Sequence, residues 1–233
     1  MQGHRARKRL TRREIKEDKL LILTSRASMF LEQNLWAIVG VVAAAVLIVI
    51  GYNIYAGWNQ RQTQQGMALV AELETLFDAQ QYDQVAARAD RIISGHIGLP
   101  DRIARLYKAD ALRAKGDFAA AKRIYEDWSP PKGDEVSSFR AAKGFADCLS
   151  AEQQYARAGD VTRNWADDHK ASGLAPHALL VAATNYELAG RFAEARGALK
   201  RILDEYPDAQ VVGRARQRNE VMDGAAKALG EPG

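Results

Sequence analysis

The sequence predicts an all-α protein in which a single N-terminal transmembrane helix precedes a solenoid of helical hairpins that ends in a C-terminal capping helix. Two observations carry this prediction. An uncharged apolar segment at residues 35–55 is long enough to cross a bilayer, and apolar residues recur after it with a period of 36 or 37 residues. The residues that follow the apolar segment are also rich in helix-forming types and contain few runs of β-branched residues.

Residues 1–34 form a basic arm, in which we expect an amphipathic helix. Thr11 and Glu14 have the spacing of a capping box, which predicts a helix from about residue 12. Its apolar residues fall on one stripe and suit a helix lying on anionic lipid. The basic residues expected to face lipid are Arg12, Arg13, Lys16, Lys19 and Arg26. Two alternatives remain open: a solvated tail that only sets topology, and docking on a cytoplasmic partner or ribosomal RNA.

Residues 35–58 are predicted to be an uncleaved signal-anchor helix. The 21 residues from 35 to 55, at about 1.5 Å each, span about 30 Å, which matches a hydrocarbon core. The aromatic residues expected at the two membrane interfaces are Trp36, Tyr52, Tyr55 and Trp58. A cleaved signal peptide is disfavoured because its apolar core is roughly 7–15 residues long. A lipoprotein is disfavoured because no suitably placed cysteine follows the apolar run.

Charge predicts the orientation of this helix. Residues 1–34 hold nine basic and four acidic residues, a charge of +5, so residues 35–233 carry −1 of the total +4. Because positively charged flanks stay in the cytoplasm, we expect a single-pass protein of the bacterial inner membrane with its N-terminus inside and residues 61–233 in the periplasm. The charge of the exported part does not support nucleic-acid binding.

The repeat is anchored on four aromatic residues: Tyr82, Phe118, Tyr155 and Phe192. Four further positions keep the same offset from each aromatic residue. Nine residues before it come Leu73, Ala109, Ala146 and Ala183, and six before it come Leu76, Leu112, Leu149 and Tyr186. Three residues after it come Val85, Ala121, Ala158 and Ala195, and ten after it come Ile92, Trp128, Trp165 and Ile202.

This pattern predicts a pair of helices per repeat, with the aromatic residue opening the second helix. The small residues allow the two helices to approach closely, and stacked pairs bury the faces that one pair leaves open. Glycine- and proline-rich breaks place four repeats within residues 66–207, at about 66–99, 100–133, 134–175 and 176–207. Residues 208–233 are then the capping helix and tail, with a polar outer face.

The fourth repeat resembles the tetratricopeptide repeat family most clearly, through Ala183, Tyr186, Gly190-Arg191-Phe192, Ala195 and Pro207. The second repeat matches through Ala109, Gly116-Asp117-Phe118, Ala121 and Tyr125. The first and third repeats lack the glycine. The resemblance implies a helical solenoid that binds other proteins.

In such a solenoid the first helix of each pair lines the concave side, which would suit an extended peptide or a helix of another protein. The residues expected on this surface are Leu106, Asp110, Arg113, Lys143, Asp147, His177, Leu180, Thr184 and Glu187. The four aromatic residues of the repeat are expected to pack rather than to bind a ligand.

The sequence contains no arrangement of residues that indicates catalysis. The four histidines have no metal-site spacing with a cysteine or an acidic cluster, and no phosphate-binding loop or nucleophile motif occurs. Cys148, the single cysteine, falls at an apolar helix position and is predicted to be a core residue. We therefore expect no enzymatic activity, no cofactor, no metal and no small-molecule substrate.

The whole arrangement of arm, anchor and solenoid resembles the ancillary SecYEG translocon subunit family. That resemblance implies contacts with the translocon and a membrane-anchored isomerase, and a role in handing exported chains to periplasmic chaperones. Two alternatives stay open: a stoichiometric accessory subunit of a large respiratory, photosynthetic or envelope-assembly complex, and an envelope or cell-division coordinator that self-associates through its repeats.

The predicted topology can be tested with a tag at either end of the chain. A tag at Gly233 should be accessible to protease from the outer face of the inner membrane, whereas a tag near Gln2 should be protected. Protease treatment of spheroplasts followed by immunoblotting measures this. A cytoplasmic Gly233 would remove every periplasmic partner from consideration.

Overall fold

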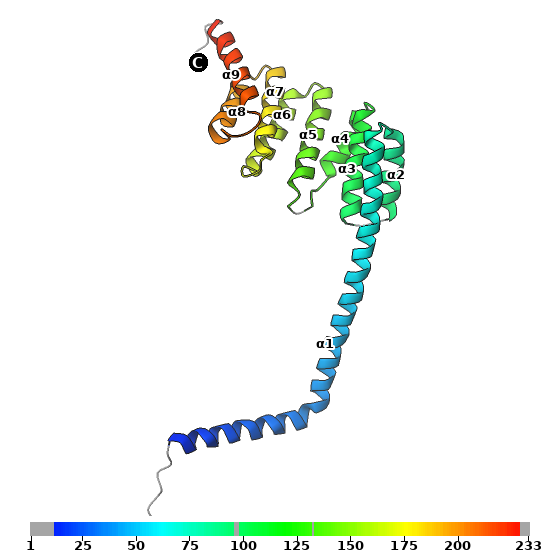
Figure 1. Ribbon diagram of the computed structural model, residues 1–233, viewed down its shortest axis with the longest axis vertical. Coiled ribbons are helices and arrows are strands. Elements are labelled where there is room, and N and C mark those ends of the chain that lie inside the picture. Colours follow the sequence, from blue (N-terminus) through cyan, green and yellow to red (C-terminus); the bar gives the residue numbers. More distant parts are fainter. Residues whose placement is uncertain (1–11, 96–97, 132, 229–233) are drawn as a thin grey trace, which may run out of the picture. The chain divides into compact units, whose positions relative to one another are not determined.

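The computed structural model describes the backbone of residues 12–95, 98–131 and 133–228, and the side chains of residues 36–37, 39–95, 98–131 and 133–224. Regular secondary structure in these ranges is entirely α-helical, which confirms the predicted fold class. The helices are α1 (Arg12–Asp78), α2 (Tyr82–Gly95), α3 (Leu99–Ala114), α4 (Phe118–Asp127), α5 (Glu135–Ala151), α6 (Tyr155–Asp168), α7 (Ala175–Leu188), α8 (Phe192–Glu205) and α9 (Val212–Ala228) (Figure 1).

Helix α1 is longer than the sequence pattern suggested. It runs without interruption through the expected arm helix, the expected membrane segment and the first helix of the first repeat. No proline occurs before Pro100, so nothing in this stretch blocks the backbone hydrogen bonds of a helix. The chain nevertheless divides into two compact units, Met1–Gln60 and Arg61–Gly233, and α1 contributes to both.

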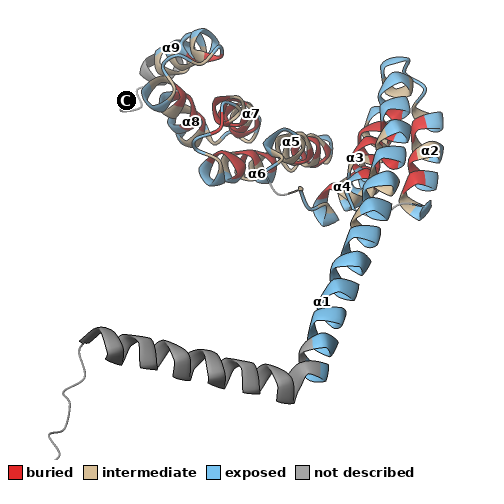
Figure 2. Cartoon of the chain, turned by 60° about the horizontal axis from the view of Figure 1, so that its bottom comes forward, coloured by how far each residue is buried: buried red, intermediate tan, exposed pale blue. Residues whose placement is uncertain are grey.

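The apolar part of α1 meets the length and composition of a membrane span. Among the described residues, Val39–Asp78 contains an 18-residue window of mean hydropathy 2.1, none of which is buried (Figure 2). The four expected interface aromatics, Trp36, Tyr52, Tyr55 and Trp58, are all more than half exposed. The side chains of the basic arm residues Arg12, Arg13, Lys16, Lys19 and Arg26 lie outside the described residues.

Residues 61–233 form a stack of helical hairpins. The repeat aromatics Tyr82, Phe118, Tyr155 and Phe192 are the first residues of α2, α4, α6 and α8. From α2 to α9 almost every helix packs on the next, and α5 also contacts α3 and α7, which are the first helices of the neighbouring pairs (Figure 1). This is the stacking that the repeat predicts.

The turn inside each hairpin uses one backbone conformation in all four repeats. The residue two positions before the aromatic has a positive φ in each: 58° at Gln80, 86° at Gly116, 61° at Gln153 and 72° at Gly190. A left-handed residue satisfies the last carbonyl groups of the preceding helix, and glycine adopts this conformation without a Cβ penalty. The first and third repeats therefore keep the turn although they lack the glycine.

The small residues of the repeat form the contact between paired helices. The residues nine before and three after each aromatic are all fully buried, and they form the contact surface within each hairpin (Figure 2). The last pair is covered by α9, in which Ala215 is buried and Met222 packs against the α7–α8 core, and by Val211 directly before this helix, which is also buried. Arg214 and Arg216 of α9 are exposed, as a terminal helix requires.

Two tyrosines lie directly on helical glycines of a neighbouring helix. A Cβ atom added at Gly144 of α5 would lie 2.7 Å from Cε1 and from the hydroxyl oxygen of Tyr125 in α4. A Cβ atom added at Gly159 of α6 would lie 2.7 Å from Cδ1 of Tyr186 in α7. Because both tyrosine rings are buried, neither can move aside without disturbing the packing between repeats.

The contact between Gly144 and Tyr125 makes a stability prediction. Gly144→Ala should lower the free energy of unfolding by about 1–3 kcal/mol, because overpacking outweighs the higher helix propensity of alanine. The matched control is Gly197→Ala in α8, where the new Cβ has no neighbour within 4 Å and stability should stay equal or rise by up to about 1 kcal/mol. Urea unfolding of the detergent-solubilised chain, followed by circular dichroism, measures both. Equal midpoints for the two variants would contradict the prediction.

Candidate protein-binding pocket on the inner helices

Four of the predicted inner-face residues line one pocket of about 340 Å³ formed by α1, α3 and α5. They are Asp110 and Arg113 of α3, and Lys143 and Asp147 of α5. The other lining residues are Glu74, Phe77, Asp78, Tyr107, Arg140 and Gly144. The pocket lies wholly within the repeat unit, Arg61–Gly233, and carries four carboxylates and three cationic side chains.

Asp110 joins three helices around this pocket. Its side chain is only 3% exposed, and it accepts hydrogen bonds from the hydroxyl of Tyr125 in α4 and from Nε of Arg140 in α5, the latter at 2.5 Å. Burial raises the pKa of Tyr125 well above its ordinary value, and the charge of Asp110 raises it further, so the tyrosine stays a neutral donor. A buried carboxylate is tolerated here because it is both paired and hydrogen-bonded.

Arg140 is held in the pocket by an aromatic ring as well as by a carboxylate. Its guanidinium carbon lies 4.2 Å from the centroid of the Tyr107 ring, while its Nε donates to Asp110. A planar guanidinium can stack on a ring and bind a carboxylate at the same time, which gives a directional contact between α3 and α5. The pocket therefore already contains one bound guanidinium from its own chain.

A second carboxylate, that of Asp147 on α5, pairs with the remaining cations of the pocket. Asp147 accepts from Arg113 Nη1 at 3.1 Å and from Lys143 Nζ at 2.9 Å. Each of the three cationic side chains in the pocket thus has a carboxylate partner. These ion pairs are partly exposed, so their main effect is to set the geometry between repeats and not to add much stability.

The inner face of the fourth repeat is covered in a different way. Arg218 of the capping helix α9 donates to the hydroxyl of Thr184 at 2.8 Å and to the carboxylate of Glu187. These two predicted binding residues are therefore occupied by the chain's own terminal helix. A partner that used them would have to displace Arg218.

Two of the predicted binding residues are wrong, because they are packed inside the protein. Leu106 is fully buried with Ala109, Ala121 and Tyr125, and Leu180 is buried in the core of the fourth repeat. Both lie 12 residues before the aromatic residue of their repeat. The equivalent residue of the first repeat, Val70 in α1, is buried as well. That position points into the packing between helices, and only Lys143 differs because its long chain reaches the surface. His177 is half-buried on α7 and does not line the pocket.

The sequence-based prediction missed six of the pocket residues. Arg140 occupies the same repeat position as His177, 15 residues before the aromatic, so the repeat itself could have identified it. Glu74 shares the position of Asp110 and Asp147, eight residues before the aromatic. Phe77 shares the position of Arg113 and Glu187, five residues before the aromatic. Asp78, Tyr107 and Gly144 share no position with a predicted residue, and their place in the pocket depends on how neighbouring helices cross.

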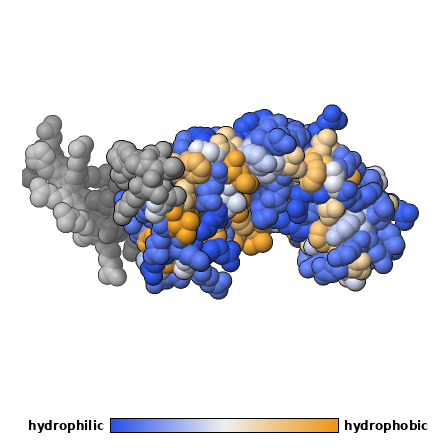
Figure 3. Space-filling view, turned by 90° about the horizontal axis from the view of Figure 1, so that it is seen from above, coloured by the Kyte–Doolittle hydropathy of each residue, from blue (hydrophilic) through white to orange (hydrophobic). Residues whose placement is uncertain are grey.

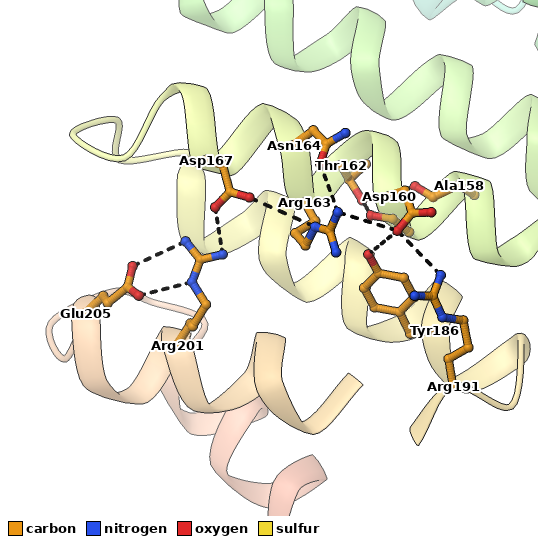
Figure 4. A network of polar contacts seen from close by, with 11 residues as sticks. Ala158, Asp160, Thr162, Arg163, Asn164, Asp167, Tyr186, Arg191, Arg201 and Glu205 are labelled. Atoms are coloured by element: carbon orange, nitrogen blue, oxygen red, sulfur yellow. Dashed lines mark hydrogen bonds and ion pairs between the residues drawn. The ribbon is translucent and has the colours of Figure 1, made fainter. Parts of the chain in front are cut away.

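A second polar network joins α6 of the third repeat to α7 and α8 of the fourth (Figure 4). Asp160 of α6 accepts from the hydroxyl of Tyr186 at 2.7 Å and lies 3.5 Å from Nη1 of Arg191. Asp167 of α6 lies 2.8 Å from Nη1 of Arg201 in α8, which also pairs with Glu205 at 3.0 Å. Polar bridges on both faces of the stack therefore oppose changes in its curvature.

The described residues provide no metal-binding or nucleophilic site. No group of three or more His, Cys, Asp or Glu side chains within them could hold a metal ion. Cys148 is buried, as predicted, and burial raises the pKa of its thiol to about 11, so the thiol is protonated at neutral pH. On the face that Figure 3 shows, polar residues cover most of the repeats and apolar residues lie in small separate groups.

Stacked helical hairpins with this period define the class of helical-repeat proteins. A model of a tetratricopeptide repeat-like domain matches residues 29–161, and a tetratricopeptide repeat model matches residues 177–209. The chain belongs to the tetratricopeptide repeat-like family. No curated protein and no solved structure matches it.

The central position of Asp110 makes a second stability prediction. Asp110→Ala should lower the free energy of unfolding by about 3–5 kcal/mol, because it leaves the buried Tyr125 hydroxyl and the Arg140 guanidinium without their acceptor. Asp83→Ala is the matched control, since it also removes one ion-paired carboxylate, but one that is 85% exposed, and it should cost less than about 1 kcal/mol. Chemical unfolding of the full chain compares them. A similar loss in both variants would show that Asp110 does not join the repeats.

Proposed function

We propose that this chain is a membrane-anchored, non-enzymatic scaffold whose helical repeats bind another protein. One observation carries the proposal: the family match runs without a break from residue 29 to residue 161, and so includes the apolar segment, the first two hairpins and the third as far as the middle of α6. An anchor and a binding domain that belong to one family domain are expected to act together. The scaffold needs no cofactor, metal, nucleic acid or small-molecule substrate.

The inner helices supply the surface for such a partner. The pocket between α1, α3 and α5 is open, polar at its rim and partly aromatic, which suits side chains of an extended segment or of a helix. The ion pairs between α3 and α5 hold this surface in one arrangement before a partner arrives. A preformed surface reduces the entropic cost of binding.

We place the protein in a bacterial inner membrane, with residues 61–233 in the periplasm. The candidate span in α1 and the positive charge of residues 1–34 support this placement. The partners are then other membrane or periplasmic proteins, and the basic arm adds a contact with anionic lipid on the cytoplasmic side.

The more specific form of the proposal is an adaptor between the protein translocon and periplasmic chaperones. A tethered repeat domain next to an export channel meets unfolded segments as they emerge, and a half-open polar pocket holds such segments only weakly, as transfer requires. The support is the combination of one candidate membrane span and one repeat domain of a protein-binding class.

A second candidate is a stoichiometric subunit of a large membrane complex. The polar bridges on both faces of the repeats favour it, because Arg140–Asp110 and Arg201–Asp167 stiffen the stack as a docking surface for a folded partner. Rigid surfaces that change little on binding are typical of stable assemblies.

In vivo crosslinking distinguishes the two candidates. The native protein is purified in mild detergent with and without prior crosslinking, and the recovered proteins are quantified by mass spectrometry. The adaptor predicts translocon subunits and a membrane-bound isomerase that are recovered mainly after crosslinking. The subunit predicts one complex at fixed stoichiometry in both samples.

Two outcomes count against the proposal as a whole. Recovery of this chain alone in both samples would contradict a scaffold role. A measurable chemical turnover by the purified chain would contradict the non-enzymatic assignment.

A further inference from the structure

We infer that Glu74 and Asp78 of α1, with Phe77 on the same face, bind an arginine or lysine side chain of the partner, so that the pocket selects basic protein segments. This inference rests on the proposed function, because it assigns a chemistry to the partner of the same pocket. It starts from a position that all four repeats share.

The residue eight positions before each aromatic is an acceptor in every repeat: Glu74, Asp110, Asp147 and Thr184. Three of these acceptors receive a basic side chain from the chain itself. Asp110 binds Arg140, Asp147 binds Arg113 and Lys143, and Thr184 binds Arg218. The side chains of Glu74 and of Asp78, one helical turn further along, are exposed, and neither makes an ion pair or a hydrogen bond with the described residues.

One of the three pairings follows the repeat frame, and it has no equivalent at Glu74. Asp147 and Thr184 are paired with residues at other positions of the frame. The cation for Asp110 comes from Arg140, which lies 15 residues before the aromatic of the following repeat. The corresponding residue that follows Glu74 is Ile103 of α3, which packs in the apolar core of the first repeat. The acceptor is thus present in the first repeat, whereas its intramolecular donor has been replaced by a core residue.

The groups around Glu74 match those that already hold Arg140. The Arg140 guanidinium is fixed by a ring, Tyr107, and a carboxylate, Asp110. On the α1 side of the same pocket, Phe77 and Asp78 lie three and four residues after Glu74, which places all three side chains on one helical face. The apolar stem of an arginine or lysine can pack on Phe77 while its charged end reaches Glu74 or Asp78.

The charge balance of the pocket excludes an acidic partner for this position. Every cation that lines the pocket is ion-paired with Asp110 or Asp147, so an incoming carboxylate would have to compete with one of these two side chains. The two unpaired carboxylates would repel it. A basic side chain, in contrast, neutralises a charge that the chain leaves uncompensated.

Fluorescence anisotropy with labelled peptides tests the inference. The full chain is reconstituted in nanodiscs of zwitterionic phosphatidylcholine, and three 12-residue Gly/Ser/Leu peptides are compared that carry three arginines, three glutamines or three glutamates. The arginine peptide should bind most tightly, and its Kd should rise with salt. Glu74→Gln combined with Asp78→Asn should raise that Kd about five- to tenfold, since two partly exposed ion pairs are lost.

The matched control is Glu126→Gln combined with Asp204→Asn, which changes the net charge equally at two exposed carboxylates outside the pocket. It should change the Kd less than twofold. Equal binding of the arginine and glutamine peptides, preference for the glutamate peptide, or equal effects of the two double variants would each overturn the inference. Circular dichroism of both double variants confirms that they remain folded.

Failure of this inference is separable from failure of the proposed function. If crosslinking recovers a protein partner while no peptide prefers arginine, the scaffold role stands and the selection of basic segments is wrong. If the arginine peptide binds through Glu74 and Asp78 while crosslinking recovers no partner, the pocket has the inferred chemistry and the scaffold role is wrong.

Discussion

The buried carboxylate of Asp110 determines how the second and third repeats fit together. It lies on α3, receives the Tyr125 hydroxyl from α4, and receives Arg140 from α5. Gly144 of α5 leaves the space that the Tyr125 ring needs to reach it. A charge in this position is stable only while all its donors are in place, so small shifts between the three helices are costly. The pocket geometry on the inner face follows from this one arrangement.

The same donors and acceptors that join the repeats also decide what the inner face can bind. Asp110, Asp147 and Thr184 are engaged within the chain, and of the described carboxylates that line the pocket, Glu74 and Asp78 are the two without an ion pair. Most polar residues on the concave side of this solenoid are therefore structural. The inferred selection of basic segments would therefore depend on the first repeat, where the pattern of internal pairing is incomplete.

The two ends of the repeat stack are closed by different means. At the C-terminal end, α9 covers the last hairpin with Ala215 and Met222, the preceding Val211 is buried beside them, and Arg218 pairs with the polar groups of α7. At the N-terminal end, α1 supplies Val70 and Leu73 to the first core and continues without interruption from the apolar segment. The first repeat is thus the one whose first helix also carries the candidate membrane span.

The sequence by itself determined the helices and their pairing. The period of 36 or 37 residues, the small residues at fixed offsets from each aromatic, and an apolar segment without charges are local or strictly repeated signals, so the order of the amino acids is enough to identify them. Only the tertiary structure decided which inner-face residues are free. Leu106 and Leu180 turned inward, Arg218 covered Thr184 and Glu187, and Glu74 was left unpaired, because burial and ion pairing depend on the crossing of neighbouring helices and not on the spacing within one of them.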